Sequence, residues 1–276
     1  MRWFNFILSH SIFVSFCAGA LVYQTLLLLS LPLNPALFGM VFFATLSAYN
    51  AYWILCKWSN DKKNQLSSKF NSYSGYFILF IAGAIAVIDY LWQMPYFLLL
   101  IISATVLTFL YVIPVLFSAS FNGFKNIGFI KTILLAITWS FFTVMVPALG
   151  LIQTHFAEVV SLFLMRFFFM LMLCIIFDSR DMAIDKIRNM PSIATFVNKK
   201  SLSWIMIFVL IGYLVSLVWL NDFIKNDRYL FVLMSCGGLT FIIYLLAIKK
   251  RGYYFYYFLV DGLMLFSSLS VYIATI

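Results

Sequence analysis

The sequence predicts an all-α integral membrane protein with about nine transmembrane helices in a single domain, residues 1–276. Of the 276 residues, 64% are hydrophobic and 10% are charged, and the mean hydropathy is +1.03. These values are far from those of soluble globular domains. The apolar residues also gather in runs of about 20, the length that one helix needs to cross a bilayer. The connectors between the runs are short and leave no room for a separate soluble domain.

Each apolar run is expected to form one span. The first run could pass for a signal peptide, because Ala18-Gly19-Ala20 resembles a cleavage site. It continues through Leu26, Leu27, Leu28 and Leu29, however, so a first transmembrane helix is the preferred interpretation. The expected spans are residues 6–30, 35–56, 75–92, 97–117, 129–152, 157–177, 203–220, 229–248 and 254–274.

The distribution of Lys and Arg predicts that the N-terminus is cytoplasmic. With nine spans and this orientation, 15 of the 18 basic residues fall on the cytoplasmic side, as the positive-inside rule requires. Lys225 and Arg228 fall outside, and Arg166 lies within a span. The net charge of +9 then follows from topology and from contact with membrane lipids, and gives no reason to expect nucleic-acid binding. The cytoplasmic residues are Arg2, Lys57, Lys62, Lys63, Lys69, Lys125, Lys131, Arg180, Lys186, Arg188, Lys199, Lys200, Lys249, Lys250 and Arg251.

The cysteines and histidines give no sign of a metal or disulfide framework. Four cysteines fall singly in or beside apolar runs without Cys-x-x-Cys spacing. His10 and His155 are equally isolated.

A cluster of acids stands where the sixth span enters the cytoplasm, in the stretch FDSRDMAIDKIRNMP. The chain has nine acidic residues, and three of them, Asp178, Asp181 and Asp185, lie within eight positions. If the helix continues past Phe177, spacings of three and four place them on one face, where they repel one another. Either nearby basic side chains or a divalent cation must compensate this repulsion. A solvated, salt-bridged loop is the simpler interpretation.

Mg²⁺ is the divalent ion that fits this cluster best, because it prefers oxygen ligands and binds through one or two carboxylates together with substrate phosphates. Arg180 and Lys186 are interleaved with the acids and suit a diphosphate. Polar residues at the same membrane face also follow spans two and four, including Asn50, Tyr111 and Lys125. We therefore expect a cavity that opens to the cytoplasm and accepts an amphiphile with an anionic head.

This pattern resembles the UbiA superfamily of intramembrane prenyltransferases. Arg180-Asp181-x-x-x-Asp185, with Asp178 before it and Met190-Pro191 after it, is similar to the second Asp-rich motif of that family. Tyr111 and Pro114, with the lysines that follow, resemble its connector after helix four. As architecture the resemblance covers the whole chain, but it is specific in only about thirty residues.

The first Asp-rich motif of the family is degenerate here. The family has Asn-Asp-x-x-Asp-x-x-x-Asp, whereas Asn50 is followed by Ala51, with Ile54 and Trp58 at the later acidic positions. The nearest acid is Asp61, eleven residues after Asn50. This departure predicts that the ligands for one of the family's Mg²⁺ ions are lost.

The resemblance implies Mg²⁺-dependent transfer of a prenyl group from a prenyl diphosphate to an aromatic or other lipophilic acceptor. Asp181 and Asp185 would be metal ligands, Asp178 a ligand or a support for the ligands, and Asn50 the surviving ligand of the first motif. Candidates for contact with the diphosphate, from the local charges, are Arg180, Lys186, Lys57 and Lys125, with Tyr111 as a further substrate contact.

Charges inside the spans need partners or a function. Arg166, Asp89 and Asp261 lie within apolar runs, and we expect Arg166 to form a structural ion pair with one of the two acids. The aromatic run Tyr253–Phe258, directly after Lys249-Lys250-Arg251, is interpreted as an interfacial belt, with a role in the pocket as the alternative.

Two other functions remain open from the sequence. A homologue that kept the fold and lost the chemistry would bind a lipid diphosphate or a partner, and the missing aspartates fit that reading. A small transporter would use Asp89, Arg166 and Asp261 as an ion path. Oligomeric state and the identity of the acceptor cannot be inferred from the sequence.

Overall fold

The computed structural model describes residues 2–64, 74–92, 102, 127–187, 198–249 and 251–276. These residues form helices and contain no strand. The elements are, in order, α1 (Arg2–Ser9), α2 (Ile12–Leu28), α3 (Pro35–Asn64), α4 (Ser74–Trp92), α6 (Ile127–Ser140), the π-helical η2 (Phe141–Met145), the 3₁₀ turn η3 (Leu149–Leu151), α7 (Phe156–Ile187), α9 (Lys199–Ile224), α10 (Asp227–Ala247), the π-helical η4 (Phe255–Val260) and α11 (Asp261–Thr275).

Local signals explain several helix ends. Asn34 Oδ1 accepts a hydrogen bond from the Ala36 N–H at 3.0 Å, and Pro35 fits the first helical position of α3, which needs no N–H donor. Asn226 caps α10 in the same way, through the Arg228 N–H at 3.1 Å. Lys225, between α9 and α10, adopts the left-handed conformation with φ 51°, which ends α9 sharply.

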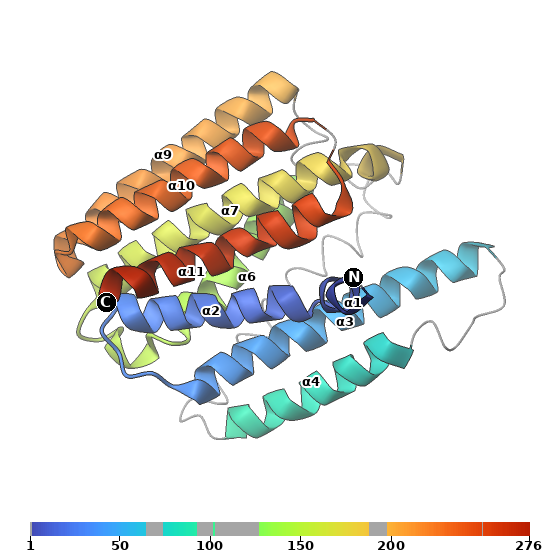
Figure 1. The fold of residues 1–276 in the computed structure, drawn as a ribbon, viewed down its shortest axis with the longest axis horizontal. Helices are drawn as coiled ribbons and strands as arrows, with labels where there is room; N and C mark the ends of the chain where they lie inside the picture. The colour runs from blue at the N-terminus through green and yellow to red at the C-terminus, as the bar shows by residue number, and fades with distance from the viewer. Residues whose placement is uncertain (1, 65–73, 93–101, 103–126, 188–197, 250) are drawn as a thin grey trace.

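The helices form one bundle in which consecutive long helices run in opposite directions (Figure 1). The end of the bundle where α3 and α7 finish is here called the motif end, because Asp178 lies near it. α4, α6, α9 and η4 begin at this end, and α2 begins there beside α1 (Figure 1). The opposite end, with the C-terminus, is called the far end. The sequence prediction places the motif end in the cytoplasm.

α7 is the central helix of the bundle. In the most apolar 18-residue stretch of Phe156–Arg180, 72% of the residues are buried, and the helix packs against α6, α9 and α10. The main apolar core joins it to α2, α10 and α11. α4, by contrast, is 6% buried and packs on α3 at the edge of the bundle. Gly83 allows this close approach, because a Cβ there would lie 3.0 Å from the Phe43 carbonyl oxygen.

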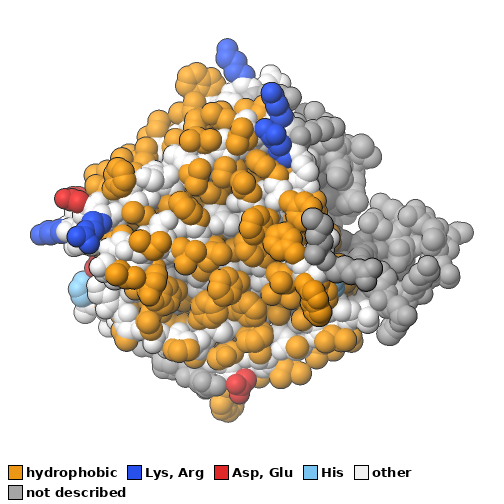
Figure 2. Space-filling model, in the orientation of Figure 1, with side chains coloured by type: hydrophobic (Ala, Val, Ile, Leu, Met, Phe, Trp, Pro, Cys, Tyr) orange, Lys and Arg blue, Asp and Glu red, His pale blue; other side chains and the backbone are white. Residues whose placement is uncertain are grey.

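The surface agrees with a membrane environment. Figure 2 shows hydrophobic side chains across the middle of one face, with charged side chains at its margins. Within the described residues, six helices are long and apolar enough to cross a bilayer, or seven if the bent pair α1 and α2 forms one span. The prediction of a helical, multi-pass membrane protein is therefore confirmed at this level. The expected span 97–117 lies outside the described residues, apart from residue 102.

Two of the expected spans differ in shape from the prediction. The run 6–30 is bent by 65° between Ser9 and Ile12, where Ser11 adopts the left-handed conformation with φ 61°. The run 129–152 contains a shorter apolar helix, Ile130–Met145, that passes from α-helix into π-helix and ends before Pro147. Proline has no N–H to donate to the helical hydrogen bonds, which explains why this helix ends before Pro147.

Candidate functional site

The acidic cluster lies on a continuous helix. α7 runs through Phe177 to Ile187, so Asp178, Asp181 and Asp185 share one face. The condition on which this arrangement was expected is therefore met. For Asp181, Asp185 and Lys186 the structure describes the backbone alone, and their side chains lie outside the described part of the chain.

Asp178 is half-buried and turned toward α6. Its Oδ2 atom accepts a hydrogen bond from the Thr132 hydroxyl at 2.7 Å. Thr132 is itself buried, so this contact fixes one carboxylate oxygen at the junction of α6 and α7. The carboxylate thus stands inside the bundle at the motif end and not in a solvated loop.

Arg180 is held by aromatic rings. Its guanidinium carbon lies 5.1 Å from the centre of the Phe177 ring, 5.2 Å from Tyr256 and 4.9 Å from Tyr257. Rings at these distances attract a cation through their quadrupoles. Tyr256 and Tyr257 both belong to η4, whose wider π-helical turn brings two consecutive residues toward α7. Such π segments are frequent at functional sites.

Asp261 is the buried carboxylate beneath this aromatic group. It is 7% exposed and follows η4 directly as the first residue of α11. It lies within electrostatic range of Arg180, and also of Cys174 on α7 and Cys17 on α2. α7, η4 and α11 therefore bring a cation, aromatic rings and a carboxylate together at the motif end.

Asn50 contacts a different part of the chain from the acidic cluster, the bend between α1 and α2. Its Nδ2 atom donates to the His10 carbonyl at 3.1 Å, where α1 and α2 separate, and to the Leu46 carbonyl at 2.7 Å. Its Oδ1 atom is buried and has no hydrogen-bond partner in the described part of the chain. The Asn50 amide therefore stabilises the bend before α2. Its Oδ1 atom remains able to bind a cation or to accept a hydrogen bond.

Arg166 does not form the expected ion pair among the described residues. It is 1% exposed, and its Nη2 atom donates to the Leu21 carbonyl and the Thr25 hydroxyl, both at 3.4 Å. Its Nε atom has no hydrogen-bond partner in the described chain. Asp89 is exposed on α4, and Asp261 lies within electrostatic range of Arg180. The prediction of an Arg166 carboxylate pair is corrected, because Arg166 donates to neutral oxygens of α2 in place of an acid.

Several other predicted contacts cannot be placed. Tyr111 and Lys125 lie outside the described residues, and the side chain of Lys57, on the last part of α3, is also outside them. The thiols of Cys17, Cys174 and Cys236 are free and buried, so no disulfide forms among the described cysteines.

The oxygen-rich side chains suit Mg²⁺ by their chemistry. Carboxylates at the face of Asp178, Asp181 and Asp185 offer the hard ligands that this ion prefers, and the buried Asn50 Oδ1 is a further oxygen without a partner. Among the described side chains alone, no group of three His, Cys, Asp or Glu is close enough to hold a metal ion. A group of three such ligands would therefore have to include a side chain outside the described part of the chain, of which Asp181 and Asp185 lie on the same helix face as Asp178.

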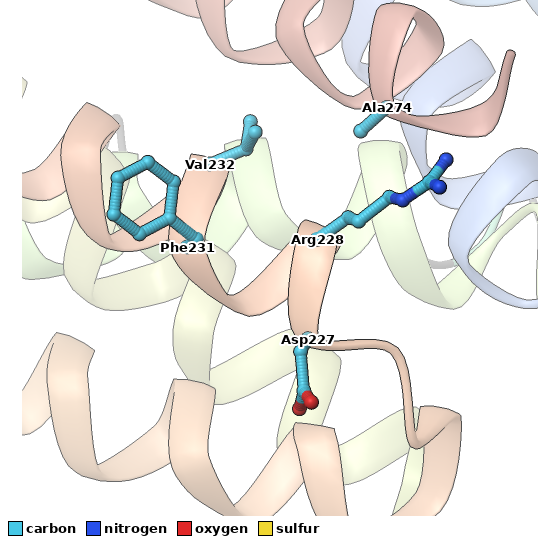
Figure 3. Close-up of a pocket in the computed structure, with 5 residues that line it drawn as sticks. All are labelled: Asp227, Arg228, Phe231, Val232 and Ala274. Atoms are coloured by element: carbon cyan, nitrogen blue, oxygen red, sulfur yellow. The ribbon is translucent and has the colours of Figure 1, made fainter.

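Two surface hollows lie at the far end of the bundle, away from this site. One, of about 460 Å³, is lined by Asp227, Arg228, Phe231, Val232 and Ala274. Figure 3 shows the Asp227 carboxylate and the Arg228 guanidinium of this hollow pointing in different directions. The other, of about 300 Å³, is bordered by the α2–α3 connector and Pro147. Neither hollow is the expected cavity at the motif end.

Some residues of the site were not among the sequence predictions. Thr132 gave no signal, because a single Thr in an apolar run usually bonds to its own helix. Tyr256 and Tyr257 were assigned to the interfacial belt, with a pocket role only as an alternative. Asp261 was identified as a charge within a span and as one of two possible partners of Arg166, whereas it lies within electrostatic range of Arg180.

Comparisons of the chain with protein-family models, with curated proteins and with solved structures find no match. The function is therefore argued from the residues of the site.

Proposed function

We propose that the chain is a Mg²⁺-dependent prenyltransferase that moves a prenyl group from a prenyl diphosphate to an aromatic or other lipophilic acceptor. The proposal includes a nine-span bundle whose cavity opens to the cytoplasm at the motif end. The observation that carries it is the continuation of α7 to Ile187, which puts three acidic positions on one helix face beside Arg180. The resemblance of this segment to the second UbiA motif supports the same reading.

The reaction needs the bond between the allylic carbon and the diphosphate oxygen to break, with the electron pair leaving on the diphosphate. Mg²⁺, when bound, supplies Lewis-acid neutralisation of that leaving group. Arg180 would add a fixed positive charge, because three rings hold its guanidinium in place before substrate arrives. Asp178, oriented by Thr132, would hold the ligand face of α7 against α6.

The acceptor then donates an electron pair to the allylic carbon and loses a proton. The apolar bundle supports this step by excluding water, which would otherwise capture the carbocation-like carbon. The aromatic walls at the motif end tolerate a nearby cation. In this account the protein contributes orientation, exclusion of water and a prearranged cation.

The test is binding of a fluorescent prenyl diphosphate to the purified chain in detergent, with Mg²⁺ and after chelation. We expect binding that requires Mg²⁺ and that falls more than about tenfold in Asp181→Ala with Asp185→Ala, since charge-assisted contacts of this kind are each worth about 1.4 kcal/mol or more. Asp222→Asn, an exposed acid near the far end, is the matched control and should bind normally.

The outcomes separate enzyme from binder. If folded wild-type protein fails to bind, or binds equally well without Mg²⁺ or without the two acids, the proposed site is wrong. If binding follows the prediction, a screen of lipophilic acceptors for release of diphosphate decides between a working transferase and a homologue that only binds the lipid.

A further inference from the structure

The N-terminal helix α1 is separate from the first span. It makes an angle of 65° with α2, and Ser11 takes the left-handed conformation at the bend. A helix at this angle to a span runs more along the membrane surface than across it. α1 lies at the motif end, beside the start of α2 and the later part of α3 (Figure 1).

α1 has one apolar and one polar face. At 100° per residue, Trp3, Phe4, Phe6 and Ile7 fall within one arc, whereas the polar Asn5 and Ser9 lie on the other side. All four apolar side chains are exposed, and Trp3 is 82% exposed. Large apolar side chains on a short helix beside a span are typical of a segment at the boundary between headgroups and acyl chains.

The exposed aromatic surface continues onto η4 and the residues before it. Phe4 stacks on Tyr254 with ring centres 6.0 Å apart and meets Phe258 edge-on at 5.2 Å. The Tyr254 hydroxyl donates to Asn5 Oδ1 at 2.6 Å. Tyr253, Tyr254 and Phe258 are themselves exposed. α1 and η4 thus form one surface, called here the α1–η4 surface.

Basic side chains border this surface. Lys249 and Arg251 are exposed, and Arg251 is fixed by a hydrogen bond from Nε to the Leu246 carbonyl at 2.9 Å and by the Phe255 ring at 5.7 Å. Partial desolvation, together with the neighbouring phenol of Tyr257, raises the pKa of Tyr253 to about 12, so its phenol adds no negative charge. Of the two acids described nearby, Asp261 is buried and Asp178 is half-buried.

We propose that the α1–η4 surface binds anionic phospholipids, with the aromatic side chains among the upper acyl chains and Lys249 and Arg251 on the headgroups. Apolar area alone would bind any lipid, whereas the fixed basic rim selects negative headgroups. The surface therefore anchors the motif end to an anionic leaflet. This inference does not depend on the proposed reaction.

The first test is the fluorescence of Trp3 in the full chain reconstituted into vesicles. The Trp3 signal is the difference between wild type and Trp3→Phe. We expect brominated phosphatidylglycerol to quench this signal more than an equal fraction of brominated phosphatidylcholine. Quenching by aqueous iodide in place of either lipid would show that α1 lies outside the membrane and would overturn the proposal, as would equal quenching by the two lipids.

The second test measures lipid selection after charge removal. Lys249→Gln with Arg251→Gln should lower the preference for phosphatidylglycerol over phosphatidylcholine, read from the lipids that copurify, by about fivefold for each basic residue. Lys225→Gln with Arg228→Gln, a basic pair at the far end, is the matched control and should leave the preference of the Trp3 signal unchanged. Both variants are also compared by the Trp3 signal, in which only Lys249→Gln with Arg251→Gln should lose the preference. Loss of the preference in the control alone would contradict the assignment to α1 and η4.

Discussion

Two arginines on α7 have opposite surroundings. Arg180, at the motif end, faces three aromatic rings and lies within range of the buried Asp261. Arg166, fourteen residues earlier and about 21 Å deeper at 1.5 Å per residue, contacts neutral oxygens at 3.4 Å. The same helix therefore carries one cation that is surrounded by compensating groups, Arg180, and one that is buried among neutral groups, Arg166.

The difference shows that the groups that compensate a positive charge on α7 lie at the motif end. Two rings of η4 contact the Arg180 guanidinium, and Asp261, the first residue of α11, lies within its electrostatic range. At the level of Arg166 the surrounding groups are the backbone and hydroxyl of α2, which give weaker compensation. A substrate anion arriving at the motif end would meet a cation whose position is already fixed.

The largest effect should follow removal of the first cation. Arg180→Met removes three cation–π contacts and the positive charge within electrostatic range of Asp261, and should lower the free energy of unfolding by about 2 kcal/mol. The half-exposure of Arg180 keeps the loss per ring small. Unfolding in mixed micelles measures the loss, and a value below about 0.5 kcal/mol would show that the ring contacts of Arg180 do not stabilise the bundle.

A smaller effect is expected for the energetic coupling between Arg180 and Asp261. A double-mutant cycle of Arg180→Met with Asp261→Asn should give an interaction energy of about 1–2 kcal/mol. The same cycle with Arg166→Met in place of Arg180→Met is the control and should give a value near zero. Coupling of Asp261 to Arg166 that exceeds its coupling to Arg180 would reverse the assignment of the acid.

The smallest effect is expected at Arg166 itself. Arg166→Met keeps most of the side-chain volume and removes a charge that has only long hydrogen bonds, so the free energy of unfolding should change by less than about 1 kcal/mol. Thr25→Val removes the hydrogen bond from the Thr25 hydroxyl to the Thr143 carbonyl. This change should lower the free energy of unfolding by about 0.6 kcal/mol, the usual value for a hydrogen bond between membrane helices. A loss of several kcal/mol in Arg166→Met would reveal a strong anionic partner.

Much of the bundle follows from hydrophobic length alone. The runs that became α4, α7, α9, α10 and α11 are long and uninterrupted, so hydropathy located them. The shared face of Asp178, Asp181 and Asp185 was expected only if the helix continues past Phe177, and α7 meets this condition. The apolar runs depend on local sequence, and local sequence is sufficient for them.

Features that depend on the backbone at single positions were not predictable. The bend at Ser11 contains neither Pro nor Gly, and Asn50, forty residues later in the chain, donates a hydrogen bond to the His10 carbonyl beside it. The π-helical turns at η2 and η4 carry no sequence signature. Without the turn at η4, the contacts of Tyr256 and Tyr257 with Arg180 could not be deduced.

The most direct test of the account is electron paramagnetic resonance of Mn²⁺, used in place of Mg²⁺, with the purified chain and inorganic diphosphate. We predict that wild-type protein binds Mn²⁺ in the presence of diphosphate, that Asp181→Asn with Asp185→Asn loses this binding, and that Arg180→Met retains the metal but needs more diphosphate. Equal Mn²⁺ binding by wild type and the double Asp variant would contradict a metal and diphosphate site on α7.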